Sequence, residues 1–284
     1  MKNQFVLNDA TYYSVEANKK YFSASQVKSF YSCEARAMAM IEGKYVPEES
    51  TSLIMGSFVD AYFNAKRCGD AKGQISGPEF NEFIEKNRKK LINSRTGELK
   101  ADFRLAEQMI ERAESDPVFM RFLKGNRQTI MTATLFGVPF KVKFDVLRDS
   151  YRVNDKRIVD VKTVKDFKPM YREGEGRLSF IEYWKYDLQM AIYQAVYEHR
   201  KGIKLPMYLA CITKENPPDI GLFHIPQEQI DMNLKLLEQD IERFRMVKAG
   251  ILEPHRCENC AYCRATRKLT GPISMAELNM DMVV

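Results

Sequence analysis

The chain has 284 residues, of which 45% are hydrophobic and 29% are charged, a composition typical of a globular protein with one large domain or two smaller ones. No run reaches the roughly 18 apolar residues that a membrane span needs. Residues 1–13 lack the apolar region of a secretory signal, so a cytoplasmic protein is expected. The net charge of +6 is compatible with a polyanionic partner but is too small to indicate one.

The N-terminal part of the chain is predicted to be mainly helical. Ser23 followed by Gln26 fits a capping box, and helix formers then continue, so one unbroken helix is expected over residues 23–42. The remaining elements expected here are helices at 51–65, 79–92 and 101–114, a loop at 66–76, and a short helix that begins at Asp116-Pro117.

From residue 127 the sequence becomes rich in Val, Ile, Phe and Thr, which favours strands. Strands are expected at 127–136, 138–149, 151–155, 157–163, 206–213 and 220–225. A polar connection is expected at 165–177, a long helix at 227–249, and a helix at 179–200 whose apolar side carries Phe180, Ile181, Trp184, Leu188, Ile192 and Ala195. This order predicts an α/β fold in which helices pack on a sheet.

Two aspartates interrupt these apolar strands. Asp160 and Lys162 lie in "IVDVKTV" and share one strand face, and Asp145 lies in "VKFDVL" fifteen positions earlier. An exposed edge strand or a partly solvated ion pair would explain Asp160 and Lys162. Alternatively, a hairpin places both carboxylates side by side, where they repel unless a cation such as Mg²⁺ or Mn²⁺ lies between them. Lys162 could then orient a water molecule or stabilise charge on a phosphate.

These residues resemble the PD-(D/E)XK nuclease motif, with Asp145 as the first acid and Asp160-Val161-Lys162 as the D-x-K. Gln189 and Tyr193, at i and i+4 of the following helix, are similar to the Q-x-x-x-Y motif of the RecB-like branch, which includes RecE-like phage exonucleases.

The same branch often has G-x-x-x-H further upstream. Here "GSFVDAYF" places Asp60 at the histidine position, where a carboxylate is also able to bind a metal.

The resemblance implies a restriction-endonuclease-like core, with a central mixed sheet flanked by helices and a helical N-terminal region. It implies one nuclease domain over 1–284, with a helical part (1–126), a catalytic part (127–226) and a C-terminal part (227–284). The implied catalytic residues are Asp145, Asp160, Lys162, Gln189 and Tyr193, and the implied ligands of Mg²⁺ or Mn²⁺ are Asp60, Asp145, Asp160 and the Val161 carbonyl. Gln189 would contact the terminal nucleotide or a metal-bound water.

Several of these residues have simpler explanations. Gln189 and Tyr193 would also fit a polar patch on an amphipathic helix, and Asp60 would also fit a surface acid. Lys141 and Lys143 share a strand face with Asp145 and are expected to be solvated beyond the site rather than to contact DNA. The basic connection at 165–177, with Lys165, Lys168, Arg172 and Arg177, could grip phosphates but could equally be solvated.

The cysteines suggest a second centre. Six cysteines in such a chain favour metal binding or burial over disulfides. Cys257, Cys260 and Cys263 form C-x2-C-x2-C, and Cys33 is the candidate fourth ligand because the set resembles the split iron–sulfur site of AddB-type nucleases. That resemblance implies a structural [4Fe–4S] cluster. Zinc, which four thiolates also bind, is the alternative. The simplest explanation is that these cysteines are free thiols in a mobile tail. Cys68 and Cys211 are expected to be unpaired.

Three functions therefore compete: a divalent-metal exonuclease that resects linear double-stranded DNA, a DNA-binding protein of the same fold without nuclease activity, and a zinc or redox module. The intact set of two acids and a lysine favours the first. The resemblance then implies double-stranded DNA ends as substrate, a single-strand annealing protein as a possible partner, and a possible homo-oligomer.

Overall fold

The computed structural model describes residues 5–65, 78–150, 155–269, 271–272 and 274–275. The helices are α1 (Val15–Lys20), α2 (Ala24–Ser32), α3 (Glu34–Ile41), α4 (Thr51–Ala65), α5 (Pro78–Leu91), α6 (Ala101–Glu114), α7 (Pro117–Phe122), α8 (Phe180–Tyr183), α9 (Tyr186–Lys201), α10 (Gln227–Lys248) and α11 (Ala261–Ala265). The strands are β1 (Asn126–Leu135), β2 (Val138–Arg148), β3 (Arg157–Val164), β4 (Met170–Arg172), β5 (Gly176–Leu178), β6 (Met207–Thr213) and β7 (Ile220–Ile225).

Strand β3, which carries the D-x-K residues, lies at the centre of a five-stranded sheet of order β1-β2-β3-β6-β7. β3 and β6 run parallel, whereas the other neighbouring pairs are antiparallel. The predicted central mixed sheet is therefore confirmed, and the exposed edge strand is wrong as an explanation of Asp160. Because parallel neighbours need a crossover, the chain between β3 and β6 passes through β4, β5, α8 and α9.

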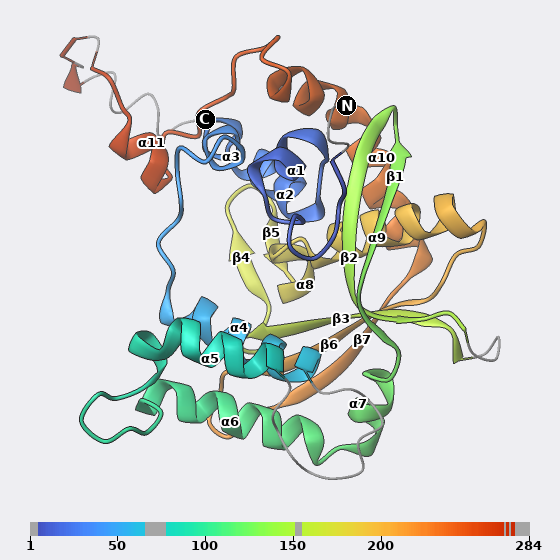
Figure 1. Cartoon of the computed structure of the whole chain (residues 1–284). Coiled ribbons are helices and arrows are strands. Elements are labelled where there is room, and N and C mark those ends of the chain that lie inside the picture. The colour runs from blue at the N-terminus through green and yellow to red at the C-terminus, as the bar shows by residue number, and fades with distance from the viewer. Residues whose placement is uncertain (1–4, 66–77, 151–154, 270, 273, 276–284) are drawn as a thin grey trace.

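Helices cover both faces of this sheet (Figure 1). One hydrophobic cluster joins the sheet to α2, α9 and α10, and a second joins it to α4, α6 and α7. Along β3, Ile158 belongs to the first cluster, and Val159 and Val161 belong to the second, as strand alternation requires. Asp160 therefore falls on the face of β3 that α9 covers.

The predicted helix over 23–42 is in fact two helices, so its expected continuity is wrong. Cys33 adopts an extended conformation, with φ −172° and ψ 109°, and separates α2 from α3. Its sulfur accepts a hydrogen bond from the backbone N–H of Arg36, as an N-cap side chain does. This local bond replaces the helical pattern and turns the thiol out of the helix.

The helix predicted over 179–200 is also interrupted. Ser179 and Glu182 form a capping box that starts α8, and Lys185 then takes the left-handed conformation, with φ 51°, before α9 begins. The break rotates α8 relative to α9, so Trp184, predicted on the apolar side, is 51% exposed. That assignment is wrong because it assumed one helical period across both segments.

Other predictions have mixed outcomes. The helices predicted at 51–65, 79–92, 101–114 and 227–249 correspond to α4, α5, α6 and α10. The polar connection at 165–177 contains the hairpin β4–β5, in which Arg172 pairs with Glu175 at 2.8 Å and Arg177 is exposed. α1 and α11 were not predicted. Residues 66–76, the predicted loop, and residues 151–154 of a predicted strand lie outside the described residues.

Within the described part of the chain, no helix combines the length and the apolar character that crossing a membrane would require.

Candidate active site

The two strand aspartates meet where β2 joins β3. Val146 pairs with Val159 in the antiparallel register, which brings Asp145 beside Asp160. Asp145 Oδ2 accepts a hydrogen bond of 2.8 Å from the backbone N–H of Val161. Burial, followed by the nearby Asp160 and Asp60, raises the pKa of Asp145 well above its ordinary value. The predicted hairpin thus places two carboxylates together in a setting that disfavours their joint ionisation.

Lys162 lies directly beside this pair. Its Nζ is 2.6 Å from Asp160 Oδ2, an oxygen that is buried, and 5.5 Å from the centre of the Tyr186 ring. Burial alone would lower the pKa of Lys162, but the carboxylates of Asp160 and Asp145 outweigh it, so its pKa is raised. The ammonium of Lys162 is therefore stabilised by the carboxylates beside it.

Helix α9 brings Gln189 and Tyr193 to the same site. Gln189 Nε2 donates to Asp160 Oδ1 at 2.8 Å and to the Tyr193 hydroxyl at 3.2 Å. The Tyr193 ring packs edge-on against Phe144 at 5.4 Å, and burial raises the pKa of its hydroxyl well above the ordinary value. A solvated polar patch is therefore wrong for these two residues, and Gln189 fixes the orientation of the Asp160 carboxylate.

Helix α4 supplies a third carboxylate, that of Asp60. The helix lies so close to β3 that a Cβ on Gly56 would come within 2.8 Å of Thr163 Oγ1. Burial raises the pKa of Asp60; Asp160 also raises it, whereas Lys162 and a hydrogen bond with Asn64 oppose the shift. Asp60 lies one helical turn after Gly56 and lines the same cavity as Asp145 and Asp160. It is therefore not an isolated surface acid.

Lys28 is a member of this site that sequence reasoning missed. From α2, its Nζ donates to Gln189 Oε1 at 2.8 Å and lies 5.2 Å from the centre of the Tyr186 ring. Burial, and then repulsion by Lys162, lower its pKa to about 8. The sequence offers only a helical spacing, since Lys28 stands four residues after the apolar Ala24 and so shares its helix face.

Gln128 was also missed. It has a φ of 49°, and its Nε2 donates to Asp145 Oδ1 at 3.2 Å and to Asn64 Oδ1 at 3.0 Å. It therefore links the β1–β2 hairpin to α4. A positive φ at a glutamine leaves no mark in the sequence, so no pattern could have identified it.

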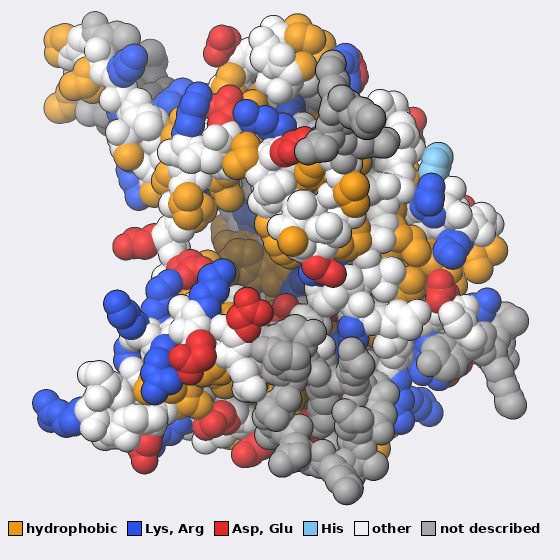
Figure 2. Space-filling view, viewed as in Figure 1, with side chains coloured by type: hydrophobic (Ala, Val, Ile, Leu, Met, Phe, Trp, Pro, Cys, Tyr) orange, Lys and Arg blue, Asp and Glu red, His pale blue; other side chains and the backbone are white. Residues whose placement is uncertain are grey.

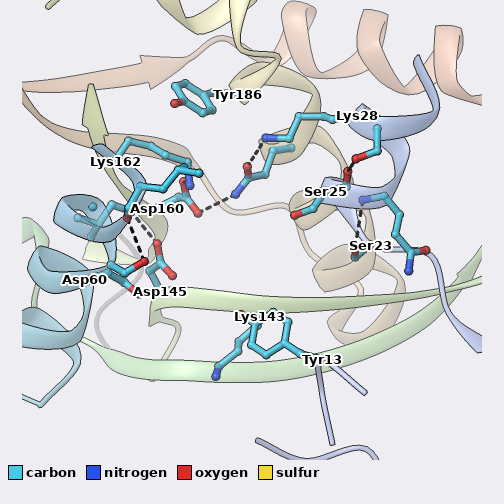
Figure 3. A pocket seen from close by; sticks show the side chains of 18 of the residues that line it. Tyr13, Ser23, Ser25, Lys28, Asp60, Lys143, Asp145, Asp160, Lys162 and Tyr186 are labelled. Atoms are coloured by element: carbon cyan, nitrogen blue, oxygen red, sulfur yellow. Dashed lines mark hydrogen bonds and ion pairs between the residues drawn. The ribbon is translucent and has the colours of Figure 1, made fainter. Parts of the chain in front are cut away.

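These side chains line a cavity of about 670 Å³. In Figure 3, Asp60, Asp145 and Asp160 point toward one another from three elements, and Lys28 approaches from the opposite side. The N-terminal segment closes part of the rim with Tyr12 and Tyr13.

Lys141 and Lys143 differ in their environment. Lys141 is only 1% exposed and donates to the Tyr12 carbonyl and, at 2.8 Å, to Asn18 Oδ1. The expectation that it is solvated is wrong, because the N-terminal segment covers this strand face. Lys143 is half-buried and pairs with Asp9 at 2.8 Å.

A separate cluster contains the four cysteines grouped in the sequence analysis. The sulfurs of Cys33, Cys257, Cys260 and Cys263 all lie within 4.8 Å of one another. Backbone N–H groups donate to the sulfurs of Cys257 and Cys260 at 3.4 Å. Such bonds outweigh burial and lower the pKa of Cys257 to about 7. The three cysteines of the tail therefore pack against Cys33 at the start of α3 and do not form a tail apart from the fold.

Other contacts hold the C-terminal segment to α3. Glu34, next to Cys33, accepts hydrogen bonds from Arg243 at 2.7 and 2.8 Å and from the backbone N–H of His255 at 2.7 Å. The ring of Tyr45 packs against that of Tyr262 at 5.3 Å. Cys211 is buried in β6, away from this cluster, and Cys68 lies outside the described residues.

A central mixed sheet with paired acids and a lysine at β2 and β3 defines a PD-(D/E)XK-type core. Residues 23–266 match the family described as "PDDEXK-like domain of unknown function (DUF3799)", and the chain belongs to this family. A solved crystal structure from Eubacterium rectale, of a protein called "Putative exonuclease", is 36% identical, with a TM-score of 0.86 over 97% of this chain and 98% of that one. A comparison with curated proteins found no match.

Proposed function

We propose that this protein is a divalent-metal-dependent DNA exonuclease that degrades linear double-stranded DNA. The observation that carries the proposal is the meeting of Asp60, Asp145, Asp160 and Lys162 in one cavity of a PD-(D/E)XK-type core. Carboxylates so placed repel one another, and a bound cation relieves that repulsion.

The donor set fits Mg²⁺ or Mn²⁺, which prefer carboxylate and carbonyl oxygens. Asp60, Asp145 and Asp160, with the Val161 carbonyl, would hold the ion. The buried Asp160 Oδ2 accepts no hydrogen bond from the described residues and lies 2.6 Å from the Lys162 ammonium, so it would be one of the coordinating oxygens. When bound, the ion would make a water molecule more acidic and stabilise negative charge on the phosphate.

The side chains of the chain itself would do the rest. Lys162, whose pKa is raised, would orient the attacking water and stabilise the charge that develops on the phosphate. Gln189 would hold the Asp160 carboxylate in place through its 2.8 Å hydrogen bond, and its amide would face the terminal nucleotide. Tyr193 would support the same amide through the 3.2 Å hydrogen bond that its hydroxyl accepts from Gln189.

The resemblance to the RecB-like and RecE-like branch and the similarity to the Eubacterium rectale protein support exonuclease activity on DNA ends. A role in phage-type recombination, a single-strand annealing partner and a homo-oligomer belong to this proposal as consequences of the same resemblance. The family match spans all three parts of the chain, which supports one nuclease domain.

The test is digestion of end-labelled linear duplex DNA against covalently closed circular DNA, with Mg²⁺, Mn²⁺ or EDTA. Nucleotides should be released from the linear substrate only, and only with a metal. Salt-sensitive binding without release under every condition would instead establish a DNA-binding protein without nuclease activity. Cleavage of the circle would contradict the exonuclease assignment.

We further propose that the four clustered cysteines hold a structural metal centre. The mutual proximity of the four sulfurs and the backbone N–H bonds to the sulfurs of Cys257 and Cys260 support thiolate ligation. A [4Fe–4S] cluster remains the centre that the resemblance implies. The sulfur spacing, at most 4.8 Å, lies nearer to that around one tetrahedral zinc, whose 2.3 Å bonds give an edge of about 3.8 Å. In a cubane each sulfur binds a different iron, so the sulfurs must stand further apart.

Metal analysis of anaerobically purified protein decides between the two. One zinc per chain with no absorbance near 400 nm would identify a single tetrahedral ion. About four irons per chain with brown colour would identify the cluster. Neither metal in protein that is folded and active would refute the centre.

A further inference from the structure

A second groove opens beside the catalytic cavity. It has a volume of about 710 Å³ and lies between α2–α3 and the segment formed by β4, β5 and α8. Ser25, Lys28, Ser29 and Tyr186 line both the groove and the catalytic cavity, so the two are adjacent. Figure 2 shows a hollow between the part of the molecule that holds α1–α3 and the part that holds α4–α5.

The groove presents an aromatic side chain that packing does not explain. Trp184 is 51% exposed in its wall, and it is the only tryptophan of the 284-residue chain. Tyr183 supports it edge-on, with ring centres 5.1 Å apart. Leaving so large a ring exposed forgoes the hydrophobic stabilisation that burial would give. A ring held this way is a surface on which another flat group can stack.

The backbone next to Trp184 is strained. Lys185 has a φ of 51°, a left-handed conformation that costs a non-glycine residue about 1–2 kcal/mol. The conformation ends α8 at Trp184 and places the Lys185 ammonium 5.3 Å from the centre of the Tyr31 ring, on the far wall. The strain therefore turns an aromatic ring and a cation into the groove together.

The groove is also positively charged. Its lining contains Lys28, Arg36, Arg172 and Lys185 against one acid, Glu175, which already pairs with Arg172 at 2.8 Å. The buried Nε of Arg36 has no hydrogen-bond partner among the residues that the structure describes. An excess of cations beside an exposed ring is the combination that binds unpaired nucleic acid, through phosphates and stacked bases.

We propose that this groove binds single-stranded DNA that continues from the strand in the catalytic cavity, with a base stacked on Trp184 and phosphates near Arg36 and Lys185. The proposal rests on the proposed function, since that function places a DNA end at Asp160. Duplex DNA does not suit the groove, because paired bases are already stacked and offer no free face to Trp184.

The single tryptophan allows a direct test in the full-length protein. The Asp160→Asn variant, without added metal, is titrated with oligothymidylate while the Trp184 fluorescence is followed. Quenching that saturates and weakens with salt is expected. In anisotropy measurements with a labelled oligothymidylate, Trp184→Ala should weaken binding about tenfold and Trp184→Phe much less, because stacking needs only an aromatic face.

Tyr171 provides the matched control, because it is 75% exposed on β4, in the hairpin that borders the groove, but does not line the groove itself. Tyr171→Ala should bind as the parent does, and an equal loss there would overturn the proposal. Saturation at lower concentrations of oligouridylate or of an acidic peptide than of oligothymidylate would also overturn it. If the wild type degrades linear duplex while Trp184 does not respond to oligothymidylate, the groove proposal fails alone; if no DNA is bound or cleaved, the proposed function fails with it.

Discussion

Replacing Lys28 with methionine tests how α2 takes part in the active site. Lys28 has donors only and the Asp160 carboxylate only accepts, so the 2.8 Å hydrogen bonds at the two ends of the Gln189 amide together hold its NH₂ group toward Asp160. Without Lys28 the amide is held only through its NH₂ group, and its position against Asp160 becomes less fixed. A hydrogen bond to a charged group contributes about 1.5–3 kcal/mol, so Lys28→Met should lower the cleavage rate about 10- to 100-fold.

The assay is single-turnover cleavage of linear duplex DNA with saturating Mn²⁺, accompanied by a Mn²⁺ titration. Lys28→Arg keeps a donor at Gln189 and should restore most of the rate. The metal affinity should change little, because Lys28 contacts Gln189 rather than the carboxylates.

A double-mutant comparison separates positioning from a direct contact with DNA. If Lys28 acts through Gln189, Lys28→Met should cost little once Gln189→Ala has removed the shared amide. An undiminished cost in the Gln189→Ala background would refute the reasoning and make Lys28 a substrate contact.

Three further expectations follow from the geometry. Asp160→Asn should lower cleavage by several orders of magnitude while the thermal melt stays cooperative, and full cleavage by this variant would contradict the assignment. Lys162→Ala should lose about 10²–10³ in single-turnover rate with Mn²⁺ affinity nearly unchanged, since it removes one electrostatic contact; loss of DNA binding alone would make it a backbone contact. Burial, and then Lys141, lower the pKa of Lys248 to about 7 in the folded state. The unfolded chain therefore binds more protons between pH 7 and about 10, and stability should rise with pH there. In urea unfolding, Lys248→Met should lessen that rise by about 1–2 kcal/mol between pH 7 and 9, and an unchanged slope would contradict the lowered pKa.

The strand core of the site could be predicted because its signals are local. An aspartate inside an apolar strand is conspicuous, and strand alternation alone puts Asp160 and Lys162 on one face. The spacing of Gln189 and Tyr193 likewise needs only a helical period. The three cysteines of the tail can be recognised in the sequence as a candidate ligand set because they are spaced three residues apart.

The contributions of α2 and α8 could not be predicted, because they depend on where helices end. Residues 23–42 consist largely of helix-forming residues, and nothing among them indicates that Cys33 adopts an extended conformation. The apolar periodicity over 179–200 likewise gives no indication of the left-handed conformation at Lys185. Those two breaks create the cysteine cluster and expose Trp184. In both places a side chain or a backbone conformation overrides local helix propensity for the sake of a tertiary contact.

The break at Cys33 also connects the two sites of the molecule. α2 carries Lys28 at the catalytic cavity and ends at Cys33 in the cysteine cluster, five residues later. α3 starts at the same cysteine, and the bonds of Glu34 with Arg243 and His255 tie it to α10 and the C-terminal segment. A helix held at its C-terminal end cannot rotate without moving Lys28 relative to Gln189. The cluster therefore lies where a structural centre would fix the orientation of α2, and with it the amide that faces Asp160.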